Sequence, residues 1–414
     1  MKRFLSIIFA LAIMLSVAAC GGNTEETPTT TVEKVKTNVA EPLTWDDINA
    51  IPLANDSMTE EELRQICLDF MRLQLTFGWT PSQTVTYSNG SREITFLAGN
   101  VYGGIPYISS TFGNIYTATQ YFDPDNGMID VSSGNGVFRQ FANQCSSSTF
   151  WSWARISNTI KYTGTSDAME KNGCLRVGPY TYDESIVDFH TSKVSTVDVC
   201  MKNGTDTMFE SYALLKAADG IVNYSKAGHV RMVSSNPVVV RNSDGSIDGG
   251  KSYITYMDQQ TGWNQQTQSN GIPYEIEGGL DVKVSFLQLF NDGYLPFTLA
   301  ELNKQAPVEK GEVSMDYKEA TVTVSKLASC KLTSNYAVSD VTLTVKDSNG
   351  KAVYTKSMNV YSPGLDKCYE PVSLFLISNA NDLKPYSDGK YTVEITAQIG
   401  TGEKLVAYTG TLTA

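Results

Sequence analysis

The chain has 414 residues and a formal net charge of −12, with 32 Lys and Arg against 44 Asp and Glu. No basic run follows the first residues, and binding to nucleic-acid phosphates depends on clustered basic side chains, so the charge argues against a nucleic-acid partner. Hydrophobic residues at 41% and charged residues at 18% are typical of a globular interior, and the length allows two domains.

The first twenty residues predict an export signal. Lys2 and Arg3 precede an apolar run that is too short to span a bilayer comfortably. The run closes on small residues and resembles the bacterial lipobox, whose cysteine is lipidated and becomes the mature N-terminus: Leu15-Ser16-Val17-Ala18-Ala19-Cys20-Gly21. The alternative is ordinary signal cleavage after Ala19. We expect residues 1–20 to be a lipoprotein signal, so that a lipid on Cys20 anchors the exported protein to the bacterial cell envelope.

Residues 21–45, rich in Thr and Glu without an apolar period, predict a flexible tether. Beyond it, Thr59-Glu60-Glu61-Glu62 is a capping box that starts a helix. The helix should end near Phe77-Gly78. Its buried stripe recurs at spacings of three and four residues: Leu63, Ile66, Cys67, Phe70 and Met71.

A second helix is predicted around Cys145, with Asn143 as its N-cap and a face formed by Phe150, Trp153, Ile156 and Ile160. Residues 85–130 are rich in turns and short β-like stretches. Three later runs favour strands because they contain many branched and aromatic residues: 194–201, 229–233 and 253–257. Residues 46–306 should therefore form an α+β domain, with a helix packed on an antiparallel sheet.

The composition changes near Pro307. From residue 312 onward apolar and polar residues alternate, as in 320–324, 341–345 and 391–395. Asp347-Ser348-Asn349-Gly350 is a hairpin turn signal between two of these runs. Residues 307–414 predict an immunoglobulin-like β-sandwich. This segment contains no histidine, and we assign it no chemistry.

Seven cysteines in an exported chain invite disulfides. With Cys20 assigned to the lipid and Cys145 to catalysis, five remain, so at least one is unpaired within the chain. Cys67 is the expected free thiol because it lies on the apolar face of a predicted helix. Two pairs are candidates, Cys174 with Cys200 and Cys330 with Cys368, and the connectivity stays open.

Cys145 and His229 together suggest a nucleophile and its base. A thiolate is the attacking species, and thiolates are stabilised at helix N-termini beside an imidazolium. The chain has only two histidines, and His190 serves as the internal comparison for His229. A buried structural cysteine or half of a disulfide is the alternative for Cys145. The small Ser146 and Ser147 that follow leave room for a substrate, which favours the catalytic interpretation.

A third polar group should orient the imidazole. The turn at Asn242-Ser243-Asp244-Gly245-Ser246 suggests a hairpin, and reflecting His229 through Gly245 arrives beside Asp258-Gln259-Gln260. We favour Gln259 for this role, and Asp258 after it.

The helix start Cys145-Ser146-Ser147, the strand Gly228-His229-Val230 and the polar residue on the next strand resemble the NlpC-type papain-like cysteine peptidases. The resemblance covers about residues 95–265. The family places Asp before its cysteine and Gly two residues after it, where this chain has Gln144 and Ser147. The separation of Cys145 from His229 is also longer than usual, which implies an insertion through about residues 165–210.

The resemblance implies a cell-surface cysteine hydrolase that cuts amide bonds in peptidoglycan stem peptides, as an endopeptidase or amidase. It implies Cys145 as nucleophile, His229 as base, and Gln259 or Asp258 as the orienting group. Tyr102 or Tyr107 would match a family tyrosine near the substrate, and the amides near Cys145 and Ser146 would bind the oxyanion. No metal or organic cofactor is needed, and no Cys/His cluster has zinc spacing.

Two rival functions remain open. One is a non-catalytic surface lipoprotein that binds glycan, peptide or host protein. The other is transglutaminase-like acyl transfer by the same Cys145 and His229 dyad.

Overall fold

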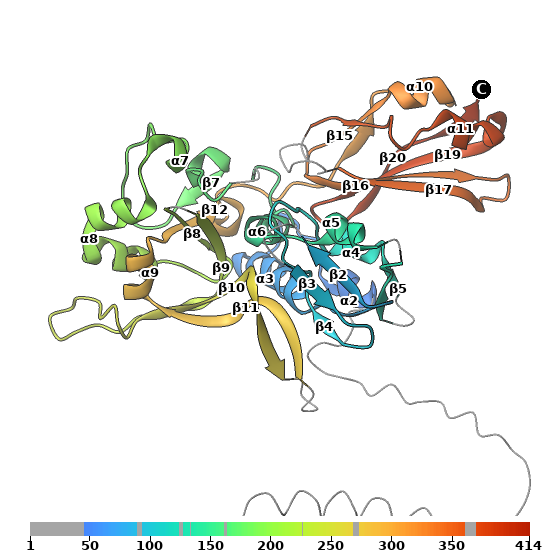
Figure 1. Cartoon of the computed structure of the whole chain (residues 1–414). Helices are drawn as coiled ribbons and strands as arrows, with labels where there is room; N and C mark the ends of the chain where they lie inside the picture. Colours follow the sequence, from blue (N-terminus) through green and yellow to red (C-terminus); the bar gives the residue numbers. More distant parts are fainter. Residues whose placement is uncertain are drawn as a thin grey trace, which may run out of the picture. The chain divides into compact units, whose positions relative to one another are not determined.

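The computed structural model describes residues 45–88, 93–123, 127–132, 134–160, 164–225, 227–267, 273–360 and 370–414 (Figure 1). The predicted signal, Cys20 and residues 21–44 of the tether lie outside the described residues, as does Cys368. The described chain is mixed α+β with several sheets. Among these residues the two large hydrophobic clusters are separate: one draws on residues 48–308 together with Ala337, and the other on residues 315–412.

A ten-stranded sheet organises the first cluster. Neighbouring strands are antiparallel except for two parallel pairs, β1 with β6 and β4 with β11. In spatial order the strands are β5 (Phe122–Asp123), β6 (Met128–Ile129), β1 (Gly78–Pro81), β4 (Tyr102–Gly103), β11 (Pro273–Ser285), β10 (Tyr253–Thr267), β9 (Gly228–Val238), β8 (Gly220–Tyr224), β12 (Leu295–Leu299) and β7 (Cys174–Arg176). A separate hairpin joins β2 (Val85–Ser88) to β3 (Glu93–Phe96).

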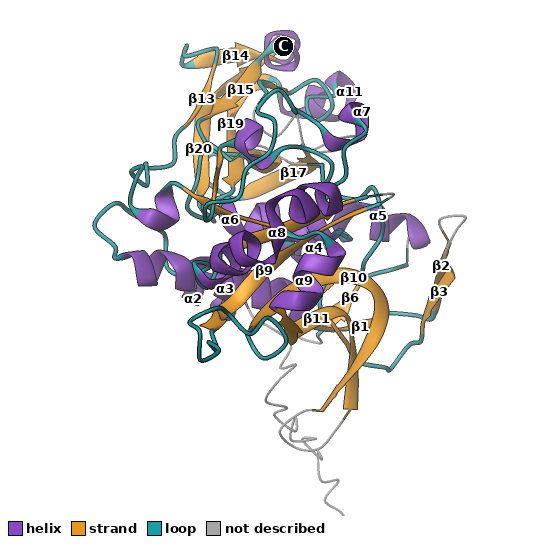
Figure 2. Ribbon diagram, turned by 90° about the vertical axis from the view of Figure 1, so that its left-hand side faces the viewer, coloured by secondary structure: helices purple, strands orange, loops and turns teal. Residues whose placement is uncertain are grey.

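Helices pack against this sheet (Figure 2), and α3 contacts α6 while both contact the central strands β9, β10 or β11. The helices of this part are α2 (Trp45–Ala50), α3 (Glu60–Thr76), α4 (Ile115–Thr119), α5 (Phe138–Phe141), α6 (Cys145–Trp153), α7 (Phe189–Ser192), α8 (Thr196–Ala213) and α9 (Phe286–Asp292).

Helix α3 forms as its sequence predicts. Thr59 is the N-cap, and Thr59 and Glu62 complete a capping box by accepting each other's backbone N–H groups. The predicted apolar stripe is buried, and Phe77 is the C-cap. Cys67 is a free, fully buried thiol on this face, as expected.

Helix α6 differs from its prediction at both ends. Its N-cap is Gln144 and not Asn143, so Cys145 is the first helical residue. The helix stops at Trp153, although the apolar spacing continues to Ile160. Ile156 and Ile160 are still buried, but they lie in the non-helical segment that follows. Apolar spacing reports burial, and burial continues here after the helical hydrogen bonds have ended.

The predicted strand at 194–201 is wrong, because this segment begins α8. Ser195 caps the helix, and its side chain accepts the N–H of Asp198, whose carboxylate accepts the N–H of Ser195. This local capping box outweighs the β preference of the branched residues. The strands predicted at 229–233 and 253–257 are confirmed within β9 and β10.

The C-terminal part holds a five-stranded and a three-stranded sheet. The first is β14 (Thr321–Thr323), β20 (Lys404–Thr413), β19 (Asp388–Ile399), β16 (Val338–Lys346) and β17 (Ala352–Asn359); the second is β13 (Val313–Met315), β15 (Lys331–Ser334) and β18 (Val372–Ser373). Helices α10 (Val324–Ser329) and α11 (Ala380–Leu383) accompany them. The turn predicted at 347–350 joins β16 to β17, with Gly350 at φ +78°.

Cys174 and Cys200, one of the two candidate disulfide pairs, are not bonded to each other. Both are buried free thiols, and Cys330 is also free. Cys200 instead contacts the Tyr212 hydroxyl and the Tyr294 carbonyl. Among the described residues, no helix is both long and apolar enough to cross a membrane.

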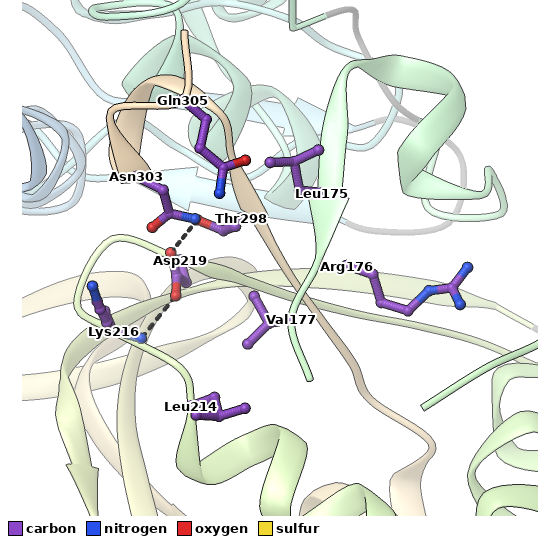
Figure 3. Close-up of a pocket in the computed structure, with 9 residues that line it drawn as sticks. All are labelled: Leu175, Arg176, Val177, Leu214, Lys216, Asp219, Thr298, Asn303 and Gln305. Atoms are coloured by element: carbon purple, nitrogen blue, oxygen red, sulfur yellow. Dashed lines mark hydrogen bonds between the residues drawn. The ribbon is translucent and has the colours of Figure 1, made fainter. Parts of the chain in front are cut away.

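A buried ion pair ties α3 to the far half of the sheet. Arg64 donates to Asp219 Oδ1 at 2.8 Å and also to the Ala217 carbonyl. Asp219 accepts the Thr298 hydroxyl and the Lys216 N–H as well (Figure 3), beside a cavity of about 500 Å³. Burial raises the pKa of Asp219, and Arg64 opposes that rise. Without Arg64 the carboxylate would be a buried charge lacking its cation.

We therefore expect Arg64→Met to lower the free energy of unfolding by about 3 kcal/mol, because one partner of a buried pair is removed. Arg72→Met, on the same helix, is the matched control. Arg72 pairs with Asp281 through side chains that are 42% and 44% exposed, so its loss should cost less than about 1 kcal/mol. Urea unfolding of both variants measures the difference, and equal losses would contradict a special role for the buried pair.

Candidate active site

Cys145 occupies the first position of α6. The preceding Gln144 has an extended backbone, and its N–H donates to Ser147 Oγ at 2.8 Å. This bond closes the first turn below the cysteine. Cys145 is buried, and so are the four small hydroxyl residues that follow it, Ser146, Ser147, Ser148 and Thr149. The N–H of Cys145 lies in the first turn, where no intrahelical carbonyl is available to it.

A buried amide on α3 fixes the position of α6. Gln74 is fully buried, and its Nε2 donates to the Ser148 carbonyl at 2.9 Å and to Ser152 Oγ at 3.0 Å. Its Oε1 accepts Asn143 Nδ2 at 3.3 Å, just before the helix begins. Because buried polar groups lose stability when left unpaired, these bonds restrict how α6 can slide along α3.

His229 and Asp258 form the second half of the site. His229 Nε2 lies 2.7 Å from Asp258 Oδ2, and Asp258 is fully buried. Arg231 Nε donates to the same Oδ2 at 3.1 Å, and the Gly279 N–H donates to Oδ1 at 2.8 Å. A Cβ on Gly279 would lie only 2.8 Å from Oδ1, so the absence of a side chain there lets β11 approach the carboxylate.

The imidazole joins the two halves. Its burial lowers the pKa of His229, but hydrogen bonds from the ring to Asp258 and Cys145, with their negative charges, outweigh burial and raise the pKa to about 9. Because Asp258 occupies Nε2, Nδ1 is the nitrogen left for the sulfur. Protonated His229 therefore stabilises the fold fully below about pH 6.5, and this stabilisation is lost as the pH rises towards 9.

Strand register explains why Asp258, and not the favoured Gln259, reaches His229. The paired residues of β9 and β10 end at Met232 with Met257, and the same register continued by one residue sets Asp258 opposite Arg231. His229 lies two residues from Arg231 and shares its side of the strand. Gln259 is one residue further along and faces the other way, where its Nε2 donates to the Ile105 carbonyl.

The two candidate tyrosines lie in different places. Tyr102 packs against Trp79 and Phe96 with ring centroids 5.4 and 5.0 Å apart, and its hydroxyl accepts the Leu97 N–H. These contacts place Tyr102 in an aromatic core. Tyr107 instead forms a parallel bridge with Asn143, two residues before Cys145. Of the two, Tyr107 is the one that the fold brings to the N-terminal end of α6.

His190 is set apart from this constellation. It is exposed on α7, and its Nδ1 lies 2.6 Å from the Tyr224 hydroxyl. The two histidines therefore differ in their partners, because only His229 has a carboxylate and a thiol beside its ring.

Sequence reasoning missed Gln74, Arg231 and Gly279. Gln74 hydrogen-bonds residues that are far away in the sequence, and no pattern in its own helix indicates this role. Arg231 did carry a signal, because a residue two places beyond a strand histidine shares its face. Gly279 could have been found only with the β10–β11 register in hand.

Comparison with models of known protein families, with curated proteins and with solved structures finds no match. The geometry of the site therefore carries the functional argument.

We expect NMR titration of the His229 ring to give a midpoint near pH 9. Asp258→Asn should move this midpoint down towards 6.5, because the neutral amide no longer favours the imidazolium. The His190 resonances, followed in the same spectra, should not respond to the substitution. A His229 midpoint unchanged by Asp258→Asn would show that the carboxylate does not govern the proton.

Proposed function

We propose that this protein is a cysteine hydrolase that cleaves amide bonds through Cys145, His229 and Asp258. The observation that carries the proposal is the continuous chain from the thiol at the start of α6, through the imidazole, to a buried carboxylate. A structural cysteine has no need of a partner histidine that is itself held by a carboxylate. Nucleophilic catalysis requires both.

In the acylation step, the Cys145 thiolate attacks the carbonyl carbon of the scissile amide and a C–S bond forms. The carbonyl electrons move onto oxygen, giving a tetrahedral oxyanion. As the oxyanion collapses, the C–N bond breaks and protonated His229 gives its proton to the leaving amine. Asp258 holds the ring through Nε2 and balances its charge, so Nδ1 stays aimed at the reacting atoms.

In the deacylation step, neutral His229 takes a proton from water, and the resulting hydroxide attacks the thioester. The C–S bond breaks, a carboxylic acid leaves, and the thiolate and imidazolium are restored. In both steps the Cys145 N–H, at the positive end of a nine-residue helix, supplies one donor for the oxyanion. Ser146, next in the same turn, is the second candidate.

Peptidoglycan stem peptides are the substrate class we propose, on the resemblance of the Cys145 and His229 segments to NlpC-type peptidases. The same resemblance supports a papain-like fold for residues 46–306. An immunoglobulin-like fold for residues 307–414 and an envelope location through lipid on Cys20 complete the proposal. The region proposed as an insertion, 165–210, contains β7, α7 and most of α8.

The first test measures nucleophile activation without assuming a substrate. We expect iodoacetamide to label Cys145 of the purified full-length protein rapidly near neutral pH, as followed by mass spectrometry. His229→Ala should slow the labelling by about tenfold or more, because the thiolate loses its imidazolium partner. His190→Ala is the matched control and should label like wild type. Equal rates in all three proteins would remove the basis for an activated dyad.

The second test measures turnover on purified peptidoglycan, with mass spectrometry of the released fragments. Wild type should create new amino and carboxyl termini within stem peptides, and Cys145→Ala should create none. Asp258→Asn should lower the rate by about a hundredfold, since the ring loses its carboxylate. Gln259→Leu should stay within about tenfold of wild type. Products joined to an added amine would indicate acyl transfer, and a reactive Cys145 without any product would favour a binding protein.

A further inference from the structure

Arg231 places a rigid cation beside the catalytic pair. Its guanidinium carbon lies 4.0 Å from the ring centroid of Tyr256 and 4.7 Å from that of Tyr294, so aromatic rings hold the group along with Asp258. Such contacts stabilise a guanidinium and limit its rotation. The Arg231 side chain is only 14% exposed. Its orientation is therefore set before any ligand arrives.

Only one edge of this guanidinium is used within the described part of the chain. Nε donates to Asp258, whereas Nη1 and Nη2 donate to no described acceptor. Neither nitrogen belongs to the fully buried atoms that lack a partner, so both remain accessible to solvent. The negative charge of Asp292 also acts on both tyrosine rings, but its Oδ1 accepts the Gln288 amide and no hydrogen bond joins it to Arg231 among the described residues. Two parallel donors on a fixed plane match a carboxylate.

The position of Arg231 sets where such a carboxylate would lie. Arg231 and His229 are two residues apart on β9, so their backbone positions are roughly 7 Å apart along the strand, and both side chains contact Asp258 Oδ2. That separation is about the length of two backbone residues in an extended chain. A carboxylate bound by Arg231 would therefore be a part of the substrate that lies beside the scissile amide and takes no part in bond cleavage.

We propose that Arg231 is a specificity residue that binds a free carboxylate of the substrate, one or two residues from the scissile amide. This inference rests on the proposed function and narrows it to acidic amide substrates. Arg231 meets the carboxylate with Nη1 and Nη2 while Nε stays on Asp258. Neutral amides of the same shape lose these two charge-assisted bonds and react more slowly.

The test compares two alkylating reagents at Cys145: N-iodoacetylglutamate and its neutral diamide. The measured quantity is the ratio of the anionic to the neutral labelling rate in full-length protein. Arg231→Gln should lower this ratio by about tenfold or more, because a charge-assisted contact is lost. Arg231→Lys should give an intermediate ratio, since it keeps the charge without the paired donors. Arg72→Gln, which removes a surface arginine on α3, should leave the ratio unchanged.

A second measurement needs only wild type. Added N-acetylglutamate should slow labelling by the neutral reagent, whereas N-acetylglutamine amide should not. If Arg231→Gln slows both reagents equally, Arg231 serves only to hold Asp258 and the carboxylate proposal is overturned. Equal effects of the two acetyl compounds overturn it as well. Because labelling requires no turnover, a protein that shows the ratio change but cuts no peptidoglycan would retain the subsite and lose the proposed hydrolase function.

Discussion

The buried carboxylate of Asp258 is the constraint around which the site is built. A charge with no exposed surface must be matched by donors, because desolvation otherwise makes it very unfavourable. The three donors come from β9 and β11, on either side of the strand that carries Asp258. The same interaction that orients His229 therefore holds three strands in register. A shift of β10 by one residue would turn Asp258 away and put Gln259 in its place, and two cations on β9 would face an amide.

A different set of contacts holds the Cys145 thiol in place. The thiol and the Asp258 carboxylate are connected through the His229 imidazole. Gln74 fixes α6 from the side of α3, and Gln259 binds the Ile105 carbonyl in the loop that runs beside Asn143. The sheet thus supplies His229 and Asp258, and the helix supplies Cys145. Neither half can be assembled from neighbouring residues alone. The geometry of the proposed active site depends on packing between α3, α6 and the central strands, and so on the core as a whole.

The parts of the fold that sequence predicted well are those set by local interactions. Thr59 and Glu62 announce α3 because both halves of the capping box lie within one turn, and Gly350 marks its hairpin because the turn needs a positive φ. The sequence also paired Cys145 with His229, which the structure brings into contact, because the chain has only two histidines and so few possible pairs. Gln259 was preferred to Asp258 because reflection through Gly245 predicts which part of β10 lies near His229, but not which side of the sheet each side chain faces. Side chains on a strand alternate between the two sides with every residue. The segment after Ser195 was predicted wrongly for a different reason. Its composition favours a strand, but the capping box between Ser195 and Asp198 starts α8.

In the proposed mechanism, the shared oxygen of Asp258 would link substrate recognition to proton transfer. Oδ2 accepts from both His229 and Arg231, so the guanidinium takes part of the negative charge that would otherwise stabilise the imidazolium. A substrate carboxylate on Arg231 would offset that cation and leave more of the Asp258 charge to His229. If the carboxylate belongs to the leaving amine, its departure restores the full charge of Arg231. The pKa of the His229 ring would then fall. His229 would then be better suited to act as the base in deacylation, at the step where the reaction requires one.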